Sequence, residues 1–124
     1  MVSLLLIVKN NKFLLLRRAE EIGNFNGLFG LVGGGIEKGE TPEESLKREV
    51  MEEIGVSVDG FKFLGKYPTN IFVYYLEDPE FDENSIRLNE EHTEHKFFTY
   101  YDLINSKDVI PNNIKIVNDY MTKK

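Results

Sequence analysis

Apolar and polar residues alternate along the chain in short strand-like runs that are interrupted by two helix-like segments. The runs over residues 3–8 and 12–18 are rich in Leu, Ile, Val and Phe. The Lys-Asn-Asn sequence at residues 9–11 predicts a hairpin turn between them, because Asn tolerates a positive φ. Further strand-like runs cover residues 28–32, 56–67, 70–77 and 95–100, with a glycine-dense loop expected over 33–40 and a long polar loop over 78–94.

Residues 41–55 carry start and stop signals for a helix. Thr41 is a good N-cap, Glu44 completes a capping box with it, and Gly55 supplies a C-terminal stop. A second helix is expected over residues 111–123. Strands combined with two interspersed helices predict the α/β class, with a mixed β-sheet sandwiched between helices in an α/β/α arrangement.

The helix over residues 41–55 crowds three carboxylates, Glu49, Glu52 and Glu53, beside its apolar stripe. Like charges three or four residues apart on a helix repel each other by a few tenths of a kcal/mol per pair. Taken alone, this pattern is also typical of a solvated, Glu-rich helix flank. The alternative is that the carboxylates are held together to bind a cation, and the glycine-dense loop before the helix favours that interpretation.

The spacing of glycines, glutamates and an arginine over residues 34–56 matches a known motif. The stretch reads Gly34, five residues, Glu40, seven residues, Arg48-Glu49-Val50, one residue, Glu52-Glu53, one residue, Gly55-Val56. It resembles the signature of the Nudix hydrolases at every fixed position. The resemblance implies a Nudix fold in a single domain over residues 1–124. It also implies hydrolysis of a nucleoside diphosphate that is linked to another moiety.

The resemblance implies a divalent metal cofactor, Mg²⁺ or possibly Mn²⁺. Carboxylate and carbonyl oxygens are the ligands that these hard cations prefer. The expected metal-binding residues are the carboxylates Glu49, Glu52, Glu53 and Glu91 together with the main chain at Gly33 and Gly34. The two glycines are also expected to meet substrate phosphate, and Glu52 and Glu53 are expected to take part in catalysis. Arg48 and Glu40 are expected to pair and to hold the loop against the helix.

Within the family, the chain looks most like the small MutT-type nucleoside triphosphate pyrophosphohydrolases. Phe97 takes the place of their usual Trp, and Glu91 lies six residues before it, where that group has a further metal-binding or water-activating carboxylate. His92 lies five residues before Phe97, where the GDP-mannose hydrolase branch has a histidine base. Both residues stay candidates, with Glu91 preferred; on the residues alone, this loop is also a plausible solvated acidic segment.

Substrate-binding residues are implied at two further positions. Arg18 lies in an Arg-Arg-Ala segment that in MutT-type enzymes supplies an arginine to the substrate, although a solvated strand-end arginine is equally compatible with the pattern. Asn112 lies nine residues after Leu103, where an Asn reads the purine base, but it is also a natural helix N-cap. The aromatic residues that could stack on a base, or belong to the core instead, are Phe25, Phe29 and Tyr67.

Two departures from the MutT-type pattern bear on the substrate. Val32 stands where those proteins usually have Pro, and Gly30 stands where they often have an acidic residue, which weakens any expectation of oxidised-purine specificity. The expected activity is hydrolysis of a nucleoside triphosphate to a monophosphate and pyrophosphate. The alternatives are a nucleoside diphosphate sugar or a dinucleoside polyphosphate as substrate, or a Nudix-fold module that senses a nucleotide without cleaving it.

Composition narrows the class of protein and its partners. The 124 residues are 41% hydrophobic and 29% charged, so a single globular domain is expected. The net charge is −6, so a nucleic acid polymer is not expected as a partner. There is no cysteine, so a metal site with thiolate ligands and a cysteine nucleophile are both excluded. The longest apolar run, residues 4–8, is far shorter than the roughly 20 residues of a membrane span. We expect a cytoplasmic location, no membrane partner, and a monomer or a homodimer.

Overall fold

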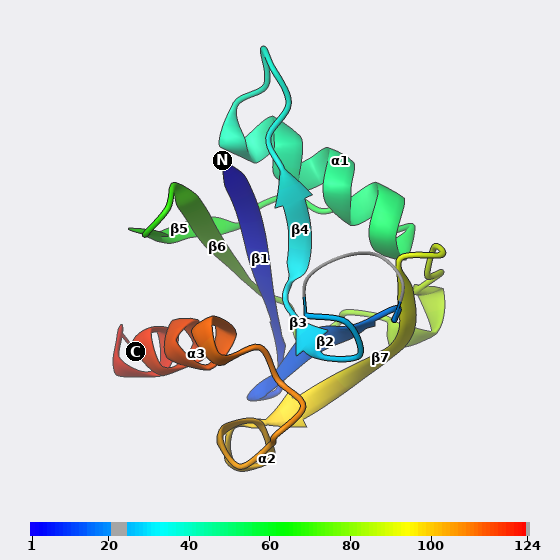
Figure 1. Cartoon of the computed structure of the whole chain (residues 1–124), viewed down its shortest axis with the longest axis vertical. Helices are drawn as coiled ribbons and strands as arrows, with labels where there is room; N and C mark the ends of the chain where they lie inside the picture. The colour runs from blue at the N-terminus through cyan, green and yellow to red at the C-terminus, as the bar shows by residue number, and fades with distance from the viewer. Residues whose placement is uncertain (21–24, 124) are drawn as a thin grey trace.

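A mixed β-sheet of seven strands separates the helices in the computed structural model, which describes residues 1–20 and 25–123 (Figure 1). The strands are β1 (Val2–Lys9), β2 (Lys12–Arg18), β3 (Phe29–Gly30), β4 (Val32–Gly35), β5 (Lys62–Tyr67), β6 (Ile71–Glu77) and β7 (His92–Thr99). The helices are α1 (Pro42–Ile54), α2 (Tyr100–Ile104) and α3 (Pro111–Lys123), with one 3₁₀ turn, η1 (Glu83–Ser85).

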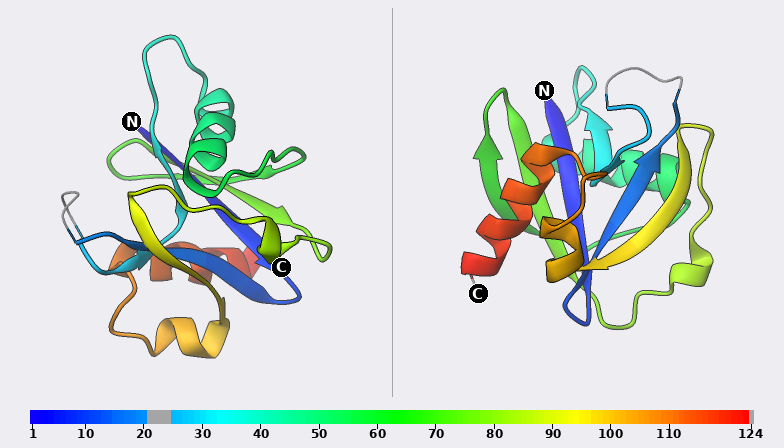
Figure 2. Two further views of the ribbon diagram at one scale, coloured as in Figure 1. Left: turned by 90° about the vertical axis from the view of Figure 1, so that its right-hand side faces the viewer. Right: turned by 60° about the horizontal axis from the view of Figure 1, so that its bottom comes forward.

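Strand β1 lies at the centre of the sheet. It pairs in parallel with β6 and antiparallel with β2 and β4, while β2 pairs antiparallel with β3 and β7. Strand β5 completes the other edge beside β6. Helices α1 and α3 lie on opposite sides of the strands (Figure 2). The predicted α/β/α arrangement around a mixed sheet is therefore confirmed.

Each face of the sheet has its own core, because alternate side chains of a strand point to opposite faces. On β1, Leu5 and Ile7 pack with the apolar stripe of α1, whereas Leu6 and Val8 pack in the cluster that contains α3. The stripe of α1 is fully buried and consists of Leu46, Val50 and Ile54. The carboxylates beside this stripe are therefore held close to the sheet.

Two local predictions are confirmed in detail. Both hydrogen bonds of the capping box between Thr41 and Glu44 are present at the start of α1, and Gly55 ends the helix in the left-handed conformation at φ 70°. The β1–β2 hairpin turns at Asn10 and Asn11, whose φ angles are 50° and 64°. A positive φ at both residues is the geometry of a type I′ turn, one of the two turns favoured in two-residue hairpins.

The glycine-dense segment begins as a strand: residues 33–35 of the predicted loop over 33–40 belong to β4, whereas residues 36–40 lie outside any strand or helix, as predicted. Gly33 and Gly34 belong to β4 and pair with Leu4 and Ser3 of β1. Gly33 has a φ of 141°, and a Cβ there would lie 2.1 Å from the carbonyl oxygen of Ser3. Only glycine fits so close to a neighbouring strand, and the repeated glycine that suggested a loop is here what allows tight pairing.

The remaining differences concern where elements begin. Strand β5 begins at Lys62, so residues 56–61 lie outside it, and β7 begins at His92, within the predicted loop over 78–94. The short helix α2 follows β7 directly and was not predicted; the side chain of Thr99 caps it by accepting from the N–H of Asp102. In residues 1–20 and 25–123, no helix is long and apolar enough to cross a membrane.

A buried amide joins α3 to the segment between β3 and β4. Asn113 is only 7% exposed, and its Oδ1 accepts from the N–H of Leu31 at 2.8 Å. A Cβ at Gly30 would lie 3.1 Å from this Oδ1 and 2.7 Å from the Cδ1 of Ile110. A larger residue at this position would therefore force the side chain of Ile110 to shift and would crowd the amide of Asn113.

We predict that Asn113→Ala lowers the free energy of unfolding by about 1–3 kcal/mol, since the buried N–H of Leu31 loses its acceptor. Asn112→Ala, one residue away on the exposed side of the helix, is the matched control and should stay within about 0.5 kcal/mol of wild type. Urea unfolding of the three proteins measures both changes. Equal losses in the two variants would show that the contact between Asn113 and Leu31 contributes nothing specific.

Candidate active site

Glu53 is a buried carboxylate that contacts β4, the strand of Gly33, Gly34 and Gly35, which is called the glycine strand below. It is 4% exposed, and its Oε1 accepts from the N–H of Gly33 at 3.0 Å. Burial raises the pKa of Glu53 to about 8, against the lowering effects of this hydrogen bond and of the Arg18 charge. Near neutral pH and without a cation, Glu53 therefore carries a proton for much of the time.

Glu49 lies one helical turn before Glu53 and packs against the next glycine. A Cβ at Gly34 would lie 2.6 Å from the Glu49 carboxylate, so any other residue there would force the carboxylate to shift. Burial raises the pKa of Glu49, and the charges of Glu52 and Glu91 raise it further, while Arg48 lowers it. The charge of Glu91 also raises the pKa of Glu53. The fold thus brings Glu91, which lies just before β7, into the electrostatic neighbourhood of the carboxylates on α1.

Arg48 connects the glycine strand to α1 through a set of charged contacts. Its guanidinium binds both carboxylate oxygens of Glu40, at 2.7 and 3.0 Å, and donates to the carbonyl oxygen of Gly35 at 3.0 Å. The predicted pairing of Arg48 with Glu40 is confirmed, and it lowers the pKa of Glu40 to about 2. Arg48 Nη1 also lies 3.0 Å from Glu49 and 3.2 Å from Glu52.

These last two contacts of Arg48 are ones that sequence reasoning missed, although the i,i+4 spacing of Arg48 and Glu52 signals one of them. Part of the crowded negative charge on α1 is therefore neutralised from within the same helix. Glu52 itself has a side chain that is 51% exposed, whereas the side chain of Glu49 is 14% exposed and Glu53 is buried. The three glutamates of the motif thus occupy different environments.

The donor set fits a hard divalent cation. All the candidate side chains offer carboxylate oxygen, and the burial of Glu53 without a full countercharge is an arrangement that a cation would relieve. Within the described part of the chain, no three His, Cys, Asp or Glu side chains form a ready-made cage for a metal. Mg²⁺ commonly binds through one or two carboxylates, waters and substrate phosphates rather than through such a cage.

Arg18 and His92 face each other across the β2–β7 ladder. The charge of Arg18 affects Glu53, whereas the neighbouring Arg17 lies over the ring of Phe29 at 5.7 Å. Arg18, rather than Arg17, is therefore the arginine close to the carboxylates. His92 is 7% exposed; burial, aided by the charge of Arg18, lowers its pKa to about 4, so that the imidazole is neutral at neutral pH. Among the described residues, His92 Nδ1 has no hydrogen-bond partner.

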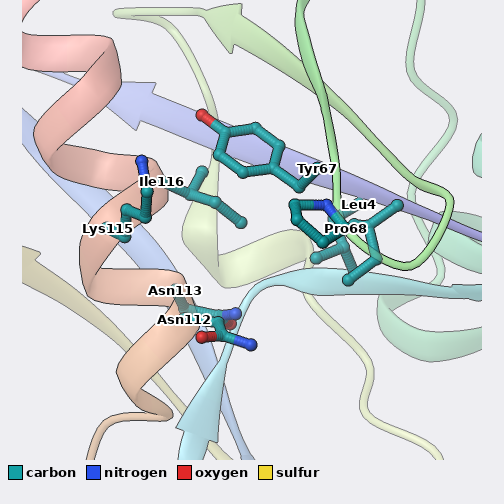
Figure 3. A pocket seen from close by; sticks show the side chains of 8 residues that line it. Leu4, Tyr67, Pro68, Asn112, Asn113, Lys115 and Ile116 are labelled. Atoms are coloured by element: carbon teal, nitrogen blue, oxygen red, sulfur yellow. The ribbon is translucent and has the colours of Figure 1, made fainter.

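A pocket of about 200 Å³ opens between α3 and the strands β1, β5 and β6 (Figure 3). Leu4, which lines it, pairs with Gly33 in the β1–β4 ladder, so the pocket and the carboxylates approach the same glycine. Asn112 and Tyr67 also line this pocket. Phe29 is instead buried in the core, and Phe25 is half-exposed beside a different hollow.

Two polar residues of this pocket, Asn113 and Lys115, were not predicted from the sequence. Helical periodicity offered a signal for Asn113, because it lies three and four residues before the buried Ile116 and Val117. Lys115 is paired with Asp119 at 3.0 Å and lies over the ring of Tyr67, 5.6 Å from its centroid. The hydroxyl of Tyr67 donates to the same Asp119 at 2.7 Å. The rim of the pocket is thus a fixed polar network.

We predict that the metal-free protein loses stability as pH rises from about 5 to about 8. The folded-state pKa of Glu53, about 8, lies above its ordinary value of 4.5, so the unfolded chain releases this proton first and stability falls over that interval. The slope due to one group is at most about 1.4 kcal/mol per pH unit. Urea unfolding in a chelator, at several pH values, measures this slope.

Glu53→Gln should remove this pH-dependent loss, whereas Glu52→Gln, at the half-exposed neighbour, should keep it. If wild type and Glu53→Gln show the same pH dependence, the proposed cost of burying the Glu53 charge is wrong.

Comparison with known proteins identifies the family. The family model described as the NUDIX domain matches residues 1–120. The chain is 33% identical over 127 residues to the ADP-ribose pyrophosphatase of Methanocaldococcus jannaschii, covering 96% of this chain and 71% of that protein. It is 48% identical over 50 residues to the nucleoside triphosphatase NudI of Enterobacter sp. (strain 638), a match that covers 40% of this chain but only 36% of that relative.

Solved structures agree on the fold. The crystal structure of the MutT protein from Methanosarcina mazei superimposes with a TM-score of 0.81, at 22% identity, covering 99% of this chain and 94% of that one. The family model and the similarity to the M. jannaschii protein, which extends over 96% of this chain, agree with the motif over residues 34–56. The chain belongs to the NUDIX domain family, and it is a Nudix hydrolase, an enzyme that cleaves pyrophosphate bonds.

Proposed function

We propose that this hydrolase is a metal-dependent pyrophosphohydrolase of nucleoside triphosphates that releases a nucleoside monophosphate and pyrophosphate. The observation that carries this proposal is the position of Gly33 between two features. On one side its N–H binds the buried Glu53, and on the other its strand partner Leu4 lines the pocket. A nucleoside in the pocket would extend its phosphates across the glycine strand toward the carboxylates.

The glycines and Arg18 supply the contacts for the phosphates. Gly33 and Gly34 have no side chains to block the approach of a phosphate group to the main chain. Arg18 contributes a permanent positive charge on the same side as Glu53, which favours a polyphosphate there. Because the chain has a net charge of −6, this local positive charge matters for substrate binding.

The cation would be held by the carboxylates Glu49, Glu52, Glu53 and Glu91, with main-chain oxygen at Gly33 or Gly34. When bound, Mg²⁺ or Mn²⁺ supplies neutralisation of the phosphate charge and polarisation of water. Arg48 keeps Glu49 and Glu52 in place for this role without competing for Glu53, with which it shares no hydrogen bond. Its own contribution is to position these carboxylates.

We assign proton abstraction from water to Glu91, with His92 as the alternative acceptor. Glu91 is partly exposed, and its charge affects both Glu49 and Glu53. Its main chain is anchored, because its carbonyl oxygen accepts from the N–H of Ala19 at 2.9 Å. His92 is neutral and so has a lone pair that can accept a proton, but its lowered pKa makes it a weak base, and its burial limits the access of water to it.

A second candidate substrate is a nucleoside diphosphate sugar. This alternative is favoured by the similarity to the ADP-ribose pyrophosphatase of M. jannaschii, which extends over 96% of this chain. The match to the nucleoside triphosphatase NudI of Enterobacter sp. (strain 638) is higher in identity but covers 40% of the chain. Both substrates contain a nucleoside diphosphate. The glycine strand and the carboxylates would bind this part of either substrate in the same way.

A hydrolysis screen with product identification tests the proposed reaction. With Mg²⁺, nucleoside triphosphates should yield monophosphate and pyrophosphate, and a chelator should abolish turnover because the polyphosphate charge is then unshielded beside the carboxylates. ADP-ribose serves as the comparison substrate. Faster turnover of ADP-ribose than of any triphosphate would favour the second candidate, and full activity in excess chelator would overturn the metal-dependent mechanism.

The roles of Glu91 and His92 are separated by substitutions that remove each basic group, Glu91→Gln and His92→Asn. Glu91→Gln should lower kcat by about 10²–10⁴, the range expected for loss of a general base. His92→Asn should lower it less, since a water molecule reaches this buried side chain with difficulty. Steady-state rates at saturating Mg²⁺, with circular dichroism to confirm folding, provide the measurement. A greater loss in His92→Asn than in Glu91→Gln would transfer the role of base to His92.

A further inference from the structure

The chain between η1 and β7 is anchored at two points beside the site. The N–H of Arg87 donates to the carbonyl oxygen of Ile54 at 2.8 Å, at the end of α1. The carbonyl oxygen of Glu91 accepts from the N–H of Ala19 at 2.9 Å, directly after β2. This segment therefore reaches from the helix that carries the motif glutamates to the strand that ends at Arg18, and Glu91 lies at its second anchor.

Asn89 lies between these two anchors and folds the main chain into a tight turn. Its side-chain Oδ1 accepts from the N–H of Glu91 at 3.1 Å, and its carbonyl oxygen accepts from the N–H of His92 at 3.3 Å. This is an Asx turn, in which a side-chain oxygen takes the place of a main-chain carbonyl. Both main-chain polar groups of Glu91 are thus bonded, one to Asn89 and one to Ala19. Together they set the direction in which the Glu91 side chain leaves the main chain.

Aspartates make two such turns elsewhere in the same loop. Asp78 accepts from the N–H of Glu80, and Asp82 accepts from the N–H of Asn84, each at 3.0 Å. Asp78 also donates its own N–H to the carbonyl oxygen of Val8, at the end of β1 that is away from the glycine strand. The turn beside the site uses an uncharged side chain instead. It makes the same hydrogen bond without adding a negative charge to the crowded carboxylates.

We propose that Asn89 is a positioning residue for hydrolysis, whose side-chain oxygen holds Glu91 where its carboxylate can take a proton from water; the inference rests on the proposed function, which gives Glu91 the role of base. A general base must lie within hydrogen-bond reach of the water that it deprotonates. A displacement of about 1 Å can lower a rate by about a hundredfold. Without the oxygen of Asn89, the N–H of Glu91 would bond to water, and the carboxylate would spend much of its time out of reach.

Three variants isolate the contribution of this oxygen. Asn89→Ala removes it, and Asn89→Ser restores an uncharged oxygen that makes a similar but weaker turn. Asp82→Ala is the matched control, because it removes a turn of the same kind from the same loop. The neighbouring Phe81 is bound through its carbonyl oxygen to Lys9, at the far end of β1, so this turn lies away from the site. Asn89→Ala is also combined with Glu91→Gln.

Steady-state kinetics at saturating Mg²⁺ use the nucleotide that wild type hydrolyses fastest. Asn89→Ala should lower kcat by about 10–10²-fold and change KM by less than about twofold, because it affects the reacting step rather than binding. Asn89→Ser should recover most of this loss. Asp82→Ala should keep the wild-type kcat even where its melting temperature falls as far as that of Asn89→Ala. In the Glu91→Gln background, Asn89→Ala should have no further effect, since it acts only through Glu91.

Amide hydrogen exchange of the metal-free protein, followed by NMR, tests the contact itself without turnover. The N–H of Glu91 should exchange faster in Asn89→Ala than in wild type or in Asp82→Ala, because only Asn89→Ala removes its acceptor. Equal exchange in the three proteins would show that the hydrogen bond does not hold Glu91 in place, and would overturn the inference.

The outcomes separate the inference from the proposed function. If no nucleotide is hydrolysed, or if Glu91→Gln keeps the wild-type kcat, the proposed function or its assignment of the base fails, and the inference fails with it. If Glu91→Gln lowers kcat but Asn89→Ala does not, or if Asn89→Ala lowers kcat equally in both backgrounds, the inference alone is wrong. Should Asn89→Ala fail to fold, Asn89→Gln takes its place, since its longer side chain moves the oxygen out of the turn.

Discussion

The close contact between α1 and the glycine strand is the constraint on which the rest of the site depends. Gly33 lies so near β1 that no side chain fits, and its N–H is thereby presented to Glu53. Gly34 leaves the space that the Glu49 carboxylate occupies. Without this approach, the carboxylates of α1 would face water, and the pocket on the other face of the sheet would have no short path to them.

Electrostatic effects at this contact lower the folding stability of the metal-free protein. Arg48 offsets part of the charge of Glu49 and Glu52, but its hydrogen bonds do not reach Glu53, whose burial raises its pKa to about 8. A buried carboxylate with incomplete compensation is a typical feature of functional sites. We interpret it as a site in which a cation completes the charge balance, and in which some folding stability is given up for binding.

Sequence reasoning reached the parts of the site that depend on local spacing. The helix, its caps and the pairing of Arg48 with Glu40 follow from residues close together in the chain. The strand formed by Gly33–Gly35 could not be predicted, because composition signals flexibility whereas pairing with β1 decides the conformation. The fixed amide of Asn113 also escaped prediction, since its partner, Leu31, is 82 residues away in the sequence.

The central claim, that Glu53 is buried for a cation rather than for the fold, is tested most directly by thermal melting with and without Mg²⁺. A ligand that binds only the folded state stabilises it by mass action, by about 2.7 kcal/mol at a hundredfold excess over Kd. This stabilisation raises the melting temperature. Wild type should melt several degrees higher with Mg²⁺, and Glu53→Gln should gain much less. An equal rise in both proteins would contradict the claim and would show that Glu53 takes no part in binding the metal.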